Sequence, residues 1–336
     1  MVKEDIRSIP LIYKLLAGLL FLLAAFVIAM LFGAAETTLS DVWMAITSFA
    51  TGDKISLIRD LRLPREIAAI FVGSALAIAG AVMQGMTRNP LADPGLLGLT
   101  AGAQAALAIA LALLPTAHYF ALMLACMIGA AVGAILVFGI SAITRGGFSA
   151  LRIVLAGVAV SSLLYAIAEG VGLAFKISKD VSMWTAGGLI GTTWGQLQVI
   201  VPCIVGGILL SLLLSKQLTI LSLSEEVAVG LGQKTTRIKI LLFLVIILLT
   251  GASVALIGNM TFVGLMVPHI VRAIVGTDYR SIIPMSALVG ASFMLMADTL
   301  GRTLNAPYET PIAAIIAIMG LPFFLFVVRR GGRILS

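Results

Sequence analysis

The chain has 336 residues, of which 60% are hydrophobic and only 11% are charged, and its mean hydropathy is +1.14. A soluble globular domain carries about 25% charged residues, so this chain has too little polar surface to cover a water-facing globule. Its net charge of +7 raises the question of nucleic-acid binding. The basic residues, however, sit singly or in small groups between apolar runs, and they form no continuous basic face. The composition predicts a protein embedded in the lipid bilayer and excludes a nucleic-acid partner.

Apolar stretches follow one another along nearly the whole chain. A transmembrane helix needs about 20 mostly apolar residues, whereas barrel strands would alternate over about 10. The pattern therefore predicts an all-α polytopic membrane protein, a single domain over 1–336 with about ten transmembrane helices. The expected spans are 14–33, 64–85, 93–114, 118–143, 152–175, 194–215, 238–260, 266–276, 281–302 and 309–328. The short eighth span cannot cross alone, so we expect it to be buried in protein or to line a cavity.

The distribution of basic residues predicts which ends face the cytoplasm. With the N-terminus inside, 15 of the 22 Lys and Arg residues fall on the inner side and 7 on the outer side. This asymmetry favours cytoplasmic N- and C-termini. The outer minority is concentrated, because four of its seven members lie together at 54–65.

Motifs for catalysis are not found. His118 and His269 have no recognisable nucleophile motif and form no H-E-x-x-H metal site. The GLGQKT sequence at 230–235 resembles a phosphate-binding loop only superficially, because Gln233 separates Gly232 from Lys234. We therefore expect no enzymatic activity, cofactor or metal site in this chain. Any energy that the protein uses must therefore come from a partner ATPase or from an ion gradient, for which Glu169 is a candidate relay.

The outer basic group includes Arg62 and Arg65, three residues apart. Proline is favoured in the first turn of a helix, so a helix starting at Pro64 would place both guanidinium groups at its mouth. Arginine there suits bidentate binding of carboxylates. These could belong to a docking protein or to an anionic ligand, while a simple interfacial anchor is the third interpretation.

Asn-Pro and Asp-Pro pairs punctuate the chain after the second span. They place Asn89 and Asp93 in a tight turn between two apolar runs, at the predicted inner mouth. Gln84 is a polar residue late in the second span. Either it hydrogen-bonds neighbouring helices together or it lines a pathway.

The longest polar interruption is 222–239, between the sixth and seventh spans. Ser224 can cap a short helix whose first turn carries Glu225 and Glu226, an arrangement that the helix dipole favours. Leu223, Val227 and Leu231 are spaced four apart and should share one face. The segment is either a cytoplasmic docking platform with an apolar face or a solvated loop.

These motifs together resemble the permease subunits of bacterial ABC importers for iron-siderophores, haem and vitamin B12. The matching stretches occur in order over nearly the whole chain, so the set is far more specific than any one member. They are RLPR at 62–65, GAVMQ at 80–84, NPLADPGLLG at 89–98, LAGV at 155–158, Glu225 with Ala228, Leu231 and Gly232, FVGL at 262–265, PHIVR at 268–272, and Ala297 and Asp298 with Arg302.

The resemblance implies a multi-pass protein of the bacterial cytoplasmic membrane. It implies a second permease subunit, identical or homologous, two cytoplasmic ATPase subunits and an external substrate-binding protein. Arg62, Arg65 and Arg302 would receive acidic residues of that binding protein. Coupling helices at about 222–237, with Ser224, Glu225, Glu226, Ala228, Leu231 and Gly232, would contact the ATPases. Gln84, Asn89, Leu91, Ser149, Ala150 and Leu151 would line the translocation path and its cytoplasmic gates.

Two positions depart from the family pattern. The last span begins Pro311-Ile-Ala-Ala314, where the family often has Pro-Ile-Gly-Val. The Ser149-Ala150-Leu151 gate is less polar than in vitamin B12 permeases, which favours an iron-siderophore cargo over haem or vitamin B12.

Overall fold

The computed structural model describes residues 9–33, 37–48, 52–143, 150–179, 181–182, 188–306 and 308–330. Over these ranges the protein forms helices and no strand. They are α2 (Leu11–Leu31), α3 (Leu39–Thr47), α4 (Asp53–Leu57), the π-helix η1 (Ile58–Arg62), α5 (Leu63–Thr87), the 3-10 helix η2 (Pro94–Leu97), α6 (Leu99–Leu113), α7 (Tyr119–Ile143), α8 (Ala150–Ala174), α10 (Trp194–Leu213), α11 (Ser215–Leu223), α12 (Glu225–Gly230), α13 (Thr235–Ile257), α14 (Val263–Val275), α15 (Tyr279–Thr303) and α16 (Ile312–Arg330).

Seven helical segments in the described ranges are long and apolar enough to cross a membrane. They are α2, the continuous segment from α4 to α5, α7, α8, α10, α13 and α15. Three shorter apolar helices accompany them, namely α6, α14 and the Ile312–Leu325 part of α16. The all-α multi-pass architecture is confirmed, and each expected span overlaps one of these helices. That all ten cross the bilayer remains a prediction.

One expected boundary is wrong for a local reason. The span expected at 93–114 contains an α-helix only from Leu99, because Pro94 opens a 3-10 turn and Gly98 adopts a left-handed φ of 79°. The polar segment expected at 222–239 holds the end of α11, all of α12 and the start of α13, and α11 begins at Ser215, directly after α10. That segment therefore contains one complete short helix, α12, between α11 and α13.

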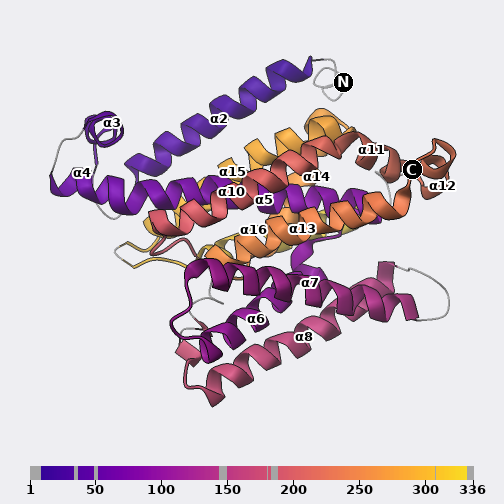
Figure 1. Cartoon of the computed structure of the whole chain (residues 1–336). Coiled ribbons are helices and arrows are strands. Elements are labelled where there is room, and N and C mark those ends of the chain that lie inside the picture. The colour runs from indigo at the N-terminus through magenta and orange to yellow at the C-terminus, as the bar shows by residue number, and fades with distance from the viewer. Residues whose placement is uncertain are drawn as a thin grey trace.

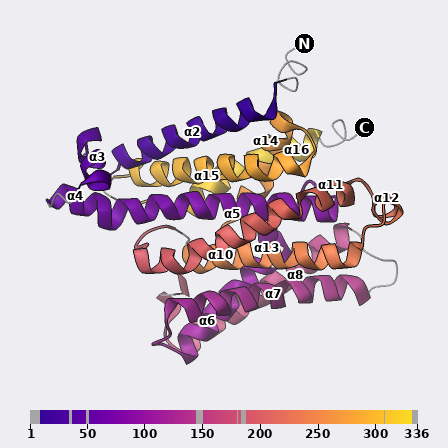
Figure 2. The same cartoon turned by 45° about the horizontal axis from the view of Figure 1, so that its top comes forward.

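The long helices lie side by side, and the molecule has two distinct ends (Figures 1 and 2). One end carries α3, α4 and the start of α5, and we call it the arginine end. The other carries α12, and we call it the α12 end. Helix α2 begins, and α16 ends, toward the α12 end in both views. Helix α3 lies across the long axes of the other helices at the arginine end.

Helix α5 forms the centre of the bundle and packs against α15, α13, α14 and α10. Its sequence is rich in Ala and Gly, which let helix backbones approach closely in lipid. A Cβ atom added at Gly80 would lie 1.9 Å from the backbone oxygen of Gly264 in α14. One added at Gly73 would lie 2.3 Å from the backbone oxygen of Gly290 in α15. These contacts fix α14 and α15 against the central helix.

Candidate functional site

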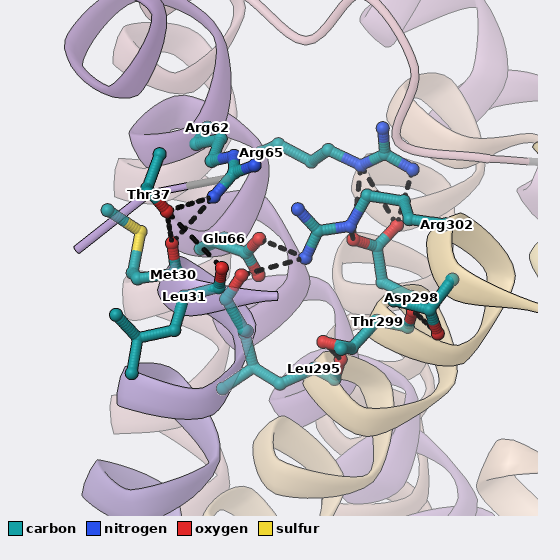
Figure 3. Close-up of polar contacts among 12 residues, drawn as sticks. Met30, Leu31, Thr37, Arg62, Arg65, Glu66, Leu295, Asp298, Thr299 and Arg302 are labelled. Carbon is teal, nitrogen blue, oxygen red and sulfur yellow. Dashed lines mark hydrogen bonds and ion pairs between the residues drawn. The ribbon is translucent and has the colours of Figure 1, made fainter. Parts of the chain in front are cut away.

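Six charged side chains meet at the arginine end, where α5 and α15 lie against each other. Figure 3 labels all of them except Glu309. The approach is antiparallel, so the start of α5 meets the end of α15. We call the group the arginine–carboxylate cluster, and its members are Arg62, Arg65 and Glu66 at the start of the α5 segment, Asp298 and Arg302 in α15, and Glu309 in the α15–α16 connection.

Two carboxylates bind Arg65, each at a different edge of its guanidinium group. Its Nε and Nη2 donate to Asp298 at 2.9–3.1 Å. Its Nη1 and Nη2 donate to the two oxygens of Glu309 at 2.9 and 2.8 Å. The hydrogen bond from Arg65 holds the pKa of the Glu309 carboxyl below its ordinary value. Each pair has the forked geometry that makes Arg–carboxylate contacts strong.

The carboxylates of Asp298 and Glu66 are fully buried, and both form ion pairs with Arg302. Arg302 Nε lies 3.0 Å from Asp298 Oδ2, one helical turn away in α15, and its Nη2 donates to Glu66 at 2.5 Å. Burying an ionised carboxylate is costly unless it is paired. Here each buried carboxylate has a guanidinium partner, so the cluster joins α5 to α15 through charge-assisted hydrogen bonds.

Arg62 and Arg302 also bind the end of α2. Arg62 Nη1 donates to the Met30 carbonyl and to Thr37 Oγ1, both at 2.7 Å. Arg302 Nη2 donates to the Ala29 carbonyl at 3.2 Å. The last carbonyls of a helix have no partner within the helix and carry partial negative charge. Two guanidinium groups therefore stabilise the C-terminus of α2 and fix it to the cluster.

The three arginines predicted as docking residues thus lie together at one end, and Pro64 lies in the first turn of α5 as expected. The structure adds that Arg62 and Arg302 are only 6% and 5% exposed and bind groups of this chain. Their docking role remains a prediction. The sequence reasoning missed the partner acids Glu66 and Glu309. Glu66 had a detectable signal, because it follows Arg62 at the i,i+4 spacing of a helix.

The α12 end carries the predicted coupling segment. Ser224 caps α12 by accepting a hydrogen bond from Val227 N at 3.0 Å, with Glu225 and Glu226 in the first turn, as predicted. Lys239 of α13 pairs with Glu225 at 2.6 Å, and its hydrogen bond lowers the pKa of that carboxyl. Ala228 is fully buried, so it fixes α12 to the body of the protein.

The other side of α12 is apolar and uncovered. Val229 and Leu231 are 57% and 66% exposed, and Val227 is also exposed. Leu223 and Leu231 lie outside the six-residue helix, so the expected single helical face is wrong in detail. Gly232 turns the chain with a left-handed φ of 76°. Val227, Val229 and Leu231 therefore form a small exposed apolar surface on and directly after α12.

Gln84 ties α5 to α14. Its Nε2 donates to the Gly264 carbonyl at 3.0 Å, and its Oε1 accepts from Arg272 of α14. It is buried within the chain, which favours the interpretation that it links helices. Asn89 accepts from Leu91 N at 3.0 Å and so shapes the turn after α5.

The remaining predicted gate positions are residues 149–151. Ala150 and Leu151 lie in the first turn of α8. Ser149 lies outside the described residues. The path and gate roles of all these positions remain predictions.

The two histidines and Glu169 do not gather into a catalytic or metal centre within the described part of the chain. His269 contacts the ring of Phe323 edge-on at 5.6 Å, and His118 is exposed in the α6–α7 connection. In the ranges that the structure covers, no three His, Cys, Asp or Glu side chains could hold a metal ion. Glu169 is exposed on α8.

Comparisons with known proteins fit this architecture. Residues 20–330 match the FecCD transport family. The iron(3+)-hydroxamate import system permease protein FhuB of Bacillus subtilis (strain 168) is 40% identical over 97% of this chain and 85% of its own length. The hemin transport system permease protein HmuU of Yersinia pestis is 37% identical over 92% of this chain and 94% of its own.

A solved structure gives the same result. It is described as an inward-facing conformation of a metal-chelate type ABC transporter, and it covers 95% of this chain and 99% of its own with 28% identity and a TM-score of 0.81. The resemblance seen in the sequence motifs is therefore confirmed. With the family match extending from α2 to the end of α16, and with full-length relatives well above 30% identity, the chain belongs to the FecCD transport family.

Proposed function

We propose that this chain is the permease subunit of an ABC importer that moves ferric-siderophore complexes from an external binding protein into the cytoplasm. Alternating access, driven by two partner ATPases, would move the cargo between this chain and a second permease subunit, identical or homologous. The observation that carries the proposal is the difference between the two ends of the helix bundle. A charged cluster occupies one end, and an uncovered apolar helix occupies the other.

The α12 end is the proposed ATPase contact. Water-exposed Val229 and Leu231 are unfavourable unless a partner covers them. Ser224, Glu225, Glu226, Ala228 and Gly232 would shape and anchor that contact. The α12 end would face the cytoplasm, which agrees with the distribution of basic residues and with α2 starting and α16 ending toward it.

The arginine end is the proposed contact for the binding protein, through Arg62, Arg65 and Arg302. Gln84, Asn89, Leu91, Ser149, Ala150 and Leu151 would form the path and its gates. Haem is the second candidate cargo, because one relative of comparable identity is a hemin transport permease. A gradient-driven carrier using Glu169 is the alternative mechanism.

Uptake in proteoliposomes tests the proposal. The permease and its ATPases are reconstituted with the binding protein outside and ATP inside, and radioactive iron is offered as ferric hydroxamate, ferric citrate or haem. We expect ATP-dependent uptake of a ferric chelate that an uncoupler leaves unchanged. Uptake without ATP that an uncoupler and Glu169→Gln both abolish would refute the ATPase-driven mechanism. Preference for haem would refute only the cargo.

A further inference from the structure

The arginine–carboxylate cluster is electrically balanced within this chain. Arg65 and Arg302 pair with its three carboxylates, those of Glu66, Asp298 and Glu309. The third guanidinium group, that of Arg62, donates to the Met30 carbonyl and to Thr37 Oγ1. An end that carries three arginines in its sequence therefore does not present three unpaired positive charges. A carboxylate of an arriving protein can gain an arginine only by replacing a carboxylate that is already bound.

The three acids differ sharply in how readily they could be replaced. The side chains of Asp298 and Glu66 are 0% exposed and lie in the α5–α15 contact, whereas that of Glu309 is 33% exposed. Glu309 also lies in the connection between α15 and α16, outside both helices. It can therefore leave without disturbing a helix, and the other two cannot.

Arg65 is the arginine on which such an exchange would occur. Its Nη1 and one side of its Nη2 bind Glu309, while Nε and the other side of Nη2 bind Asp298. If Glu309 leaves, Asp298 still holds the guanidinium in place, and a forked edge with two N–H donors becomes open. A partner carboxylate would restore the same pair of hydrogen bonds.

We infer that Glu309 is an intramolecular placeholder that occupies the docking edge of Arg65 until an acidic side chain of the external binding protein displaces it. This inference rests on the proposed function. It assigns to Glu309 a role opposite to that of the arginines, since Glu309 weakens docking. Because the resting cluster is neutral, it does not attract anions at long range. It binds favourably only a partner that offers a carboxylate in the right orientation.

Glu309→Gln tests the role, because it keeps the shape of the side chain and removes its charge. The matched control is Asp60→Asn, which removes an exposed acid at the same end. Among the described contacts, Arg65 donates to Asp298 and Glu309 instead. The permease–ATPase complex is placed in nanodiscs, and binding of the purified binding protein is followed kinetically at low and high salt. Intact assembly with the ATPases shows that each variant is folded.

We expect Glu309→Gln to tighten docking roughly fivefold, the value of one exposed ion pair. The gain should lie mainly in the association rate, should shrink at high salt, and should exceed that of Asp60→Asn. Unchanged or weaker docking by Glu309→Gln would overturn the placeholder role. An equal gain from Asp60→Asn would overturn it too, since the effect would then be long-range charge alone.

A second background separates this inference from the proposed function. In Arg65→Lys, which keeps the charge but loses the fork, Glu309→Gln should give no further gain. If wild-type protein does not bind the binding protein, or if Arg65→Lys binds as tightly as wild type, the docking role of Arg65 fails. If Arg65→Lys weakens docking and Glu309→Gln alone changes nothing, docking stands and the placeholder is refuted.

Discussion

The burial of Asp298 leads to a strong prediction about stability. Asp298→Asn keeps the size of the side chain but removes the charge that faces both Arg65 and Arg302. The two buried guanidinium groups are then left with only Glu66 and Glu309. Breaking a buried ion pair by removing one partner costs about 3–5 kcal/mol.

The same change at Glu309 should be mild. A pair with an exposed member contributes about 0–1 kcal/mol, so Glu309→Gln serves as the matched control. For large domains each kcal/mol shifts Tm by about 2–4 °C, so Asp298→Asn should lower Tm by roughly 10 °C and Glu309→Gln by no more than about 4 °C.

Purified protein in detergent allows the measurement. Cys126 is fully buried in α7, so a thiol-reactive fluorescent dye in a Cys203→Ser background reports unfolding. Equal Tm shifts for Asp298→Asn and Glu309→Gln would refute the reasoning, because burial would then not decide the cost of losing a carboxylate.

Three further outcomes are expected. Gly80→Ala should lower Tm strongly, because its Cβ would lie 1.9 Å from a backbone oxygen, while Gly206→Ala, which meets nothing within 4 Å, should not. Val229→Asp should reduce co-purification of the ATPases at least tenfold, a cost above about 1.4 kcal/mol for charging an apolar contact, whereas Thr277→Asp, exposed at the same end, should not. The Tm advantage of wild type over Glu309→Gln should be constant above the unfolded-state pKa of about 4.3 and disappear as the pH falls through the lowered folded-state pKa.

Each of these has a contradicting result. A stable Gly80→Ala protein would mean that α14 can shift away from α5 at little cost. Undiminished co-purification of Val229→Asp would show that the apolar side of α12 is not the ATPase contact. A Tm difference between wild type and Glu309→Gln that grows in acid would contradict the sign of the pKa shift. A carboxyl pKa that is lowered on folding means that only the ionised carboxylate stabilises the folded state.

The helices could be predicted from sequence because lipid imposes a length and a composition on them. The cap at Ser224 and the helix start near Pro64 could be predicted for a similar reason, since both depend on residues within one turn. The break at 94–98 was missed although its signal, a Pro followed by Gly98, is local. The apolar run across it simply outweighed that signal.

The cluster could be predicted only in part. Arg62 and Arg65 were selected by their spacing around Pro64 and Arg302 by a family resemblance, and neither argument says what binds them in the resting chain. Asp298 and Arg302 are one helical turn apart, a spacing visible in sequence. No local pattern places Glu309 on Arg65, because that contact depends on how the α15–α16 connection folds back over the start of α5.

The connections between the two ends constrain how α12 could act on the cluster. The exposed ion pair between Glu225 and Lys239 joins α12 to α13, whereas α11 is joined to α15 by two hydrogen bonds of Thr219. Its Oγ1 donates to Asp278 and accepts from Tyr279 N, both at 3.0 Å. Helix α15 then runs to Asp298 and Arg302 at the other end. A displacement that an ATPase imposes on α11 and α12 would therefore reach the cluster along α15. Because Asp298 and Arg302 lie on α15, a movement of α15 against α5 would act on the two buried pairs that join these helices, Arg65–Asp298 and Arg302–Glu66.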